Sequence, residues 1–112
     1  MSNEIVSDAE VEKALDWLRD NADAIGEAKR LAVKHDKMLN HIKATAMGFH
    51  KDLPVSAQER EAYASAAYLQ AIEGAADFAG EYEKLKALRE AAALKIEVWR
   101  SASANYRAMK IG

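Results

Sequence analysis

The sequence predicts an all-α protein: two long helices forming an antiparallel coiled-coil hairpin, with a short helix at the connection. Composition is the first reason, because 112 residues with one proline and five glycines favour helix over strand. Periodicity is the second, because apolar residues recur at alternating spacings of three and four, which places them on one stripe of a helix. Charge is the third, since acidic and basic blocks alternate along the chain.

The first helix is predicted over about residues 8–51. Ser7 and Glu10 have the spacing of a capping box, in which the serine oxygen accepts the Glu10 amide. Asn21 and Gly26 are poor helix-interior residues, so a break near either one is left open. The stripe consists of Val11, Ala14, Leu18, Asn21, Ile25, Ala28, Ala32, His35, Leu39, Ile42, Ala46 and Phe49.

A turn and a short helix are predicted over residues 52–65, because Pro54 ends the first helix. Ser56–Glu59 repeats the capping-box spacing, so the short helix is expected to open one residue after Ser56. It either runs into the last helix or is separated from it by a new cap at Ser65, which we favour. The last helix is predicted over about residues 66–109. Its stripe consists of Tyr68, Ala71, Ala75, Phe78, Tyr82, Leu85, Arg89, Ala92, Ile96, Trp99, Ser103 and Tyr106.

The short connection and the charge pattern both predict that the helices fold back on each other. A short connection between two long helices favours antiparallel pairing. Residues 1–28 and 52–83 each carry a net charge of −6, whereas residues 29–51 and 84–112 each carry +5. A single fold at Pro54 sets each acidic block beside a basic one. Together these elements form one helical hairpin domain, residues 1–112.

The two stripes also predict a register, in which paired residue numbers sum to about 117. Leu18 then faces Trp99, and Phe49 faces Tyr68. His35 faces Tyr82, and we expect a core histidine bonded to a tyrosine or to a symmetry mate.

A hairpin of two helices has a thin core that burial alone stabilises with difficulty. Further apolar residues lie beside the main stripes, which is more than a solvated face needs and predicts self-association. A homo-oligomer is the simplest arrangement, although the sequence does not give the number of copies. The residues expected at this contact are Leu69, Ile72, Leu88, Val98 and Trp99.

We expect no catalytic residue, metal site, cofactor or small-molecule substrate. The chain has no cysteine, and its three histidines lack the helical spacing of a zinc pair or of a di-iron Glu-x-x-His motif. The carboxylates lie in charged blocks where nothing isolates a pair for acid–base work. We therefore expect a non-enzymatic protein. No apolar run approaches the length that crosses a bilayer, so we also expect a cytoplasmic protein with no membrane partner.

Basic residues near aromatic ones are the candidate ligand surface. Lysine and arginine contact phosphates and aromatic rings stack on bases, which is how many proteins bind single strands. The competing interpretation is structural: the charge blocks pair within the hairpin, and Trp99 and Tyr106 lie in its core. The candidate nucleic-acid-binding residues are Arg30, Lys34, Lys37, Lys95, Arg100, Arg107 and Lys110.

Three segments, Ala57–Tyr68, Leu88–Ser101 and Asn105–Met109, give the chain a resemblance to small helical phage and prophage proteins. The likeness is one of sequence style and covers most of the chain. In layout the chain is also similar to the recombination mediators of T-even phages. That resemblance implies an oligomer that binds single-stranded DNA and helps to load a recombinase in place of single-strand-binding protein.

We therefore expect a phage-encoded helical protein of DNA recombination or replication, located in the host cytoplasm. As an oligomer it would bind single-stranded DNA or a recombination partner. Two other classes remain open. One is a protein-binding inhibitor of host defence, similar to an anti-CRISPR, whose acidic segments Asp16–Glu27 and Glu73–Glu83 face a nucleic-acid-binding partner. The other is a structural coiled-coil scaffold without a ligand.

Overall fold

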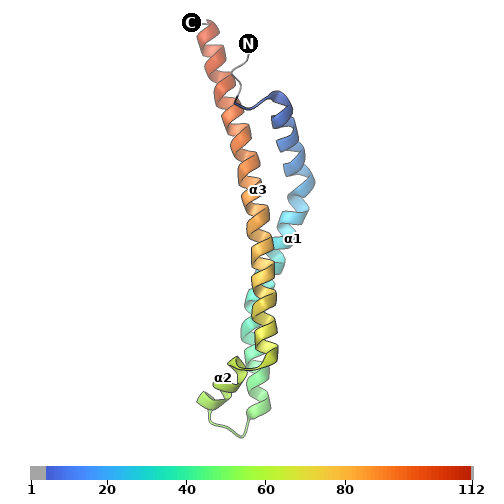
Figure 1. The fold of residues 1–112 in the computed structure, drawn as a ribbon, viewed down its shortest axis with the longest axis vertical. Helices are drawn as coiled ribbons and strands as arrows, with labels where there is room; N and C mark the ends of the chain where they lie inside the picture. Colours follow the sequence, from blue (N-terminus) through green and yellow to red (C-terminus); the bar gives the residue numbers. More distant parts are fainter. Residues whose placement is uncertain (1–4, 112) are drawn as a thin grey trace. The chain divides into compact units, whose positions relative to one another are not determined.

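The computed structural model describes residues 5–111, and this part of the chain is helical with no strand. The predicted domain also includes residues 1–4 and 112, which lie outside the described residues. The all-α class is confirmed, and the two long helices pack against each other. The elements are α1 (Asp8–Met47), the 3-10 helix η1 (Gly48–His50), α2 (Val55–Tyr63) and α3 (Ala66–Ile111) (Figure 1).

The described residues divide into two compact units, each of which pairs a part of α1 with a part of α3. Unit 1 contains the chain up to Ile25 and from Lys84 onward, whereas unit 2 is Gly26–Glu83 and includes η1 and α2. Within each unit the segments of α1 and α3 run in opposite directions (Figure 1). Each unit therefore contains one acidic and one basic block of the sequence.

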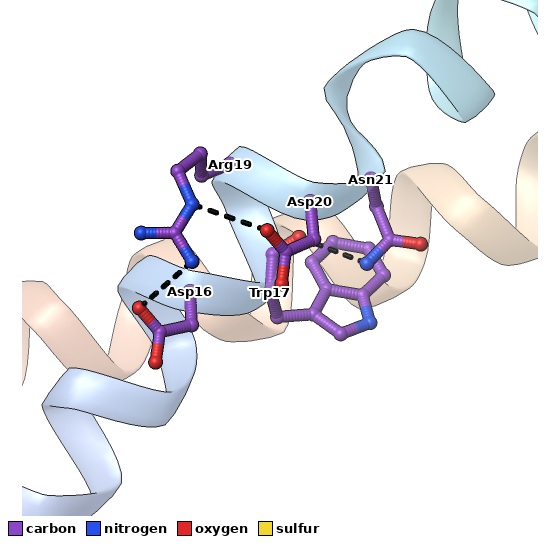
Figure 2. Close-up of polar contacts among 5 residues, drawn as sticks. All are labelled: Asp16, Trp17, Arg19, Asp20 and Asn21. Carbon is purple, nitrogen blue, oxygen red and sulfur yellow. Dashed lines mark hydrogen bonds and ion pairs between the residues drawn. The ribbon is translucent and has the colours of Figure 1, made fainter.

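The start of α1 is fixed by the expected serine cap. The amide of Glu10 donates to the Ser7 hydroxyl oxygen at 3.2 Å, which satisfies one of the amides that a helix start leaves without a partner. The helix continues through both residues at which a break was considered, Asn21 and Gly26. The Asn21 amide group donates to the Trp17 carbonyl oxygen, one turn earlier, at 2.9 Å (Figure 2), so this polar side chain is accommodated inside the helix.

The start of α2 differs from the prediction. The helix begins at Val55, with Pro54 as the N-cap residue and no side-chain cap bond, so Ser56 lies inside the first turn. Pro54 has φ −58° and ψ 153°, and its fixed φ suits the entry to a helix. The Gln58 amide donates to the Pro54 carbonyl at 2.9 Å, while the Gln58 side chain donates to the Leu53 carbonyl at 2.8 Å. The backbone geometry of proline therefore opens this helix in place of a serine cap.

Ser65 separates α2 from α3, as favoured from the sequence. Its hydroxyl oxygen accepts the Tyr68 amide at 3.2 Å, which caps the start of α3. The same hydroxyl donates to the Ala62 carbonyl at 2.7 Å. Ala62 is fully buried and Ser65 is half-buried, so this serine connects the buried end of one helix to the start of the next.

The core of unit 1 uses the predicted stripes in a different register. Val11, Ala14 and Ile25 are buried, and the Trp99 indole N–H donates to the Asp8 carboxylate at 2.7 Å. Trp99 therefore lies beside Asp8 and not beside Leu18. These two residues of α1 are about 15 Å apart along the helix at 1.5 Å per residue. Stripes rich in alanine can slide past each other at little cost, so they restrict register weakly.

In unit 2 the prediction that His35 faces Tyr82 is wrong by one helical turn. The His35 ring is stacked on Phe78, with the centroids 4.2 Å apart and the ring planes at 21°. The predicted contact between Phe49 and Tyr68 is also wrong. The Tyr68 ring lies edge-on to Tyr63 at 5.2 Å, and Phe49 is 80% exposed. α1 has already changed to the 3-10 helix at Gly48, whose three residues per turn remove the next residue from the stripe.

The two serines of the connecting region give a test of this description. Ser65→Ala should lower the free energy of unfolding by about 1 kcal/mol, the usual cost of a lost N-cap. Ser56→Ala should change it by less than about 0.5 kcal/mol, because alanine is the better helix former and no cap is lost. Urea denaturation followed by circular dichroism measures both. Equal losses in the two variants would contradict the assignment of Ser65 as the cap.

Candidate functional site

Three predicted basic residues form one exposed face of α1 in unit 2. Arg30, Lys34 and Lys37 are spaced by four and three residues, and all three are exposed. This spacing places side chains on one side of a helix. His41 follows four residues after Lys37 and is also exposed, so it extends the same face. We call these four residues the basic row.

Arg30 forms an ion pair with a neighbouring carboxylate. Its guanidinium donates to both oxygens of Glu27, at 2.6 and 2.9 Å. This hydrogen-bonded pair lowers the pKa of Glu27 and raises that of Arg30, and the charge of Lys34 lowers the pKa of Glu27 further. Lys34 and Lys37 are therefore the stronger candidates for an external anion.

Lys43 belongs to the same basic block but connects α1 to α2. Its ammonium lies 3.6 Å from the Glu59 carboxylate and 4.6 Å from the centre of the Tyr63 ring. Hydrogen bonding to Tyr63 is the main cause that raises the pKa of Lys43; burial opposes it, and the charge of Glu59 adds to the rise. The position of this cation between an anion and an aromatic face is that of a structural contact.

The other predicted basic residues, Lys95, Arg100, Arg107 and Lys110, are exposed on α3 in unit 1. Arg100 is paired with Glu97 at 2.6 Å, one turn away on the same helix. The Lys110 ammonium lies 5.6 Å from the centre of the Tyr106 ring, and Tyr106 is exposed. Unit 1 therefore has its own basic surface with an accessible aromatic ring.

In the acidic half of α1, the basic residue Arg19 is paired with two carboxylates. Arg19 lies 3.3 Å from Asp16 and 3.1 Å from Asp20 (Figure 2). The hydrogen bond and charge of Asp20, together with the charge of Asp16, raise the pKa of Arg19. These contacts connect neighbours within one helix, as do Arg30–Glu27 and Arg100–Glu97. The charge blocks of the sequence predicted pairing between the two long helices, whereas these arginines pair within their own helix.

The aromatic residues are placed differently from the prediction that assigned Trp99 and Tyr106 to the core. Trp99 is half-buried and bonded to Asp8, whereas Tyr106 is exposed. Phe49, which sequence reasoning placed in the core, lines a surface hollow of 320 Å³ in unit 2. The only sequence signal for its exposure is its position after Gly48 and before the proline turn.

The residues predicted for self-association differ in exposure. Leu69 and Ile72 of unit 2 are 56% and 43% exposed, and Leu88 of unit 1 is also exposed. Val98 and Trp99 are half-buried. Leu69 and Ile72 are three residues apart on α3, so they share one face of the helix.

Comparisons with models of protein families, with curated proteins and with solved structures give no match. Among the described residues, no three histidine, cysteine or acidic side chains form a group that could hold a metal ion. Within residues 5–111, no helix has the length and apolar character needed to span a membrane.

The ion pair of Glu27 with Arg30 can be tested by titration. Arg30→Gln should raise the pKa of Glu27 toward its ordinary value of 4.5, because the main interaction that favours the carboxylate is removed. In the native protein this interaction stabilises the fold above about pH 4.5, and its contribution is lost as the pH falls through the lowered pKa. Carboxyl carbon chemical shifts measure the pKa directly. Lys29→Gln is the control, and an equal shift there would contradict the specific role of Arg30.

Proposed function

We propose that this protein is a non-enzymatic, phage-encoded helical protein of DNA recombination or replication that binds single-stranded DNA as a homo-oligomer. The observation that carries the proposal is the basic row of α1, in which Lys34 and Lys37 are exposed at a spacing of three residues. The sequence style of phage proteins and the layout of T-even recombination mediators support the same function. Location in the host cytoplasm follows from this proposal.

The electrostatic argument is local, because the net charge of the chain is −2. Residues 29–51 carry +5, and three of the exposed cations of this block, Arg30, Lys34 and Lys37, lie along one helical face. Phosphate contacts by lysine and arginine supply most of the affinity of non-specific binding, and they release counterions. A second copy of the chain would add a second basic row, so that several weak phosphate contacts act together.

The oligomer part of the proposal is based on apolar surface. Leu69 and Ile72 are each about half exposed in the single chain, and covering such side chains is favourable by about 25 cal/mol per Å². They lie on α3, whereas the basic row lies on α1. The proposed contact through Leu69 and Ile72 therefore uses none of the side chains of the basic row.

Charge removal on the basic row gives a direct test of DNA binding. The affinity for a fluorescein-labelled oligothymidylate should fall steeply with salt, and Lys34→Gln/Lys37→Gln should reduce the slope of log affinity against log salt by about 1.4 for two phosphate contacts. Fluorescence anisotropy at several salt concentrations measures both. Arg19→Gln is the matched control, because two carboxylates already neutralise this cation, and its slope should equal that of the native protein.

If the native protein binds no oligonucleotide at low salt, the DNA-binding function is wrong. A protein-binding inhibitor of host defence and a scaffold without a ligand are then the hypotheses that remain.

The oligomer is tested separately. Leu69→Gln/Ile72→Gln should lower the sedimentation coefficient to that of a single chain, because the variant removes the apolar contact while keeping side chains that a helix tolerates. Sedimentation velocity over a range of concentrations measures it, with Leu94→Gln as an exposed apolar control in unit 1. A native protein that sediments as a single chain at all concentrations would contradict self-association.

A further inference from the structure

The strongest unassigned feature of the molecule is the hollow beside η1. It has a volume of 320 Å³ and is lined by the end of α1, by η1 and by the start of α3. This volume is near the lower end of the range of about 300–1,000 Å³ that is typical of ligand pockets. It suits one ring system better than a large ligand. The lining includes His41, Ile42, Ala46, Phe49, His50 and Ser65.

Local hydrogen bonds lie on both sides of Phe49. The Thr45 hydroxyl donates to the His41 carbonyl at 2.9 Å, within the last turns of α1. The Leu53 amide donates to the His50 carbonyl at 3.0 Å, which closes the turn after η1. These contacts order the chain on both sides of Phe49, whose ring is 80% exposed.

Single exposed apolar residues are common on protein surfaces and by themselves indicate nothing. Phe49 differs because of what surrounds it. Its hollow combines apolar walls, Ile42 and Ala46, with the polar side chains of His41 and His50, while the Ser65 hydroxyl at its edge is already bonded to Ala62 and Tyr68. His41 belongs to both the hollow and the basic row. Lys37 precedes Phe49 on the same side of the connection by about 18 Å at 1.5 Å per residue, so a strand several nucleotides long can contact both.

From this arrangement we infer that the hollow is a binding site for one unpaired nucleobase of a single strand, stacked on Phe49, while phosphates a few nucleotides farther along the strand contact the basic row. A base has an apolar face and a polar edge, and the hollow offers an aromatic ring together with hydrogen-bonding groups. The positive charge of Lys34 and Lys37 on the same helix favours a ring within a phosphate-linked strand over the apolar side chain of a neutral peptide. The inference rests on the proposed function and adds the base-binding residue to it.

The test compares an oligothymidylate with an abasic strand that carries the same number of phosphates. Phe49→Ala should weaken binding of the oligothymidylate by at least about fivefold, the lower limit of base–aromatic stacking, and should leave binding of the abasic strand unchanged. Phe49→Trp should restore the affinity, because it keeps an aromatic face. Val55→Ala is the control, since Val55 is an apolar side chain in the same unit with 65% exposure.

The outcomes separate this inference from the proposed function. Absence of any binding by the native protein overturns both. If the native protein shows steep salt dependence but Phe49→Ala binds both strands as the native protein does, only the inference about the hollow is overturned. Equal losses of affinity for the two strands also overturn the inference about the hollow. If Phe49→Ala abolishes self-association in sedimentation, the occupant of the hollow is a second copy of the chain, and the inference is again overturned. The helical circular dichroism of Phe49→Ala should match the native signal, since the ring is mostly in water.

Discussion

The close packing of small side chains between the helices is the constraint on which the rest of the structure depends. Alanine dominates the buried positions: Ala14, Ala28, Ala46, Ala62 and Ala92. Small residues allow helices to approach closely, but each one removes little apolar surface from water. The core is therefore thin, and many of the larger side chains remain partly or mostly exposed. That exposure leaves both cations and apolar residues accessible to a ligand or a second copy of the chain.

Charge acts mainly at short range in this molecule. The sequence separates acidic from basic blocks, and each unit contains one of each. Several arginines nevertheless pair with carboxylates three residues away or less, as Arg19, Arg30 and Arg100 do. Such exposed pairs contribute little to stability, because water and salt screen them. Their effect on a binding surface is larger, because an arginine held by a carboxylate offers less charge to an anion than a neighbouring lysine does.

The change from α-helix to 3-10 helix at Gly48 shows how a small backbone difference alters a site. The stripe spacing places Phe49 in the core if α1 continues, but the helix tightens one residue earlier. The phenyl ring then lies at the surface beside two histidines. The cationic face of the candidate site could be predicted, because Lys34 and Lys37 share a helical face through their spacing alone. Its aromatic part could not, because that depends on where the helix ends.

The sequence by itself determined the helical class, the start of α1 after Ser7, the cap at Ser65 and the stripes that become least exposed. These features depend on neighbours within one or two turns, so local spacing is sufficient to predict them. Only the tertiary structure decided that Trp99 bonds to Asp8, that His35 stacks on Phe78 and that Phe49 faces water. Each of these depends on register or on a helix end. Alanine-rich stripes fix register weakly, since neighbouring alignments bury similar amounts of apolar surface and differ little in free energy.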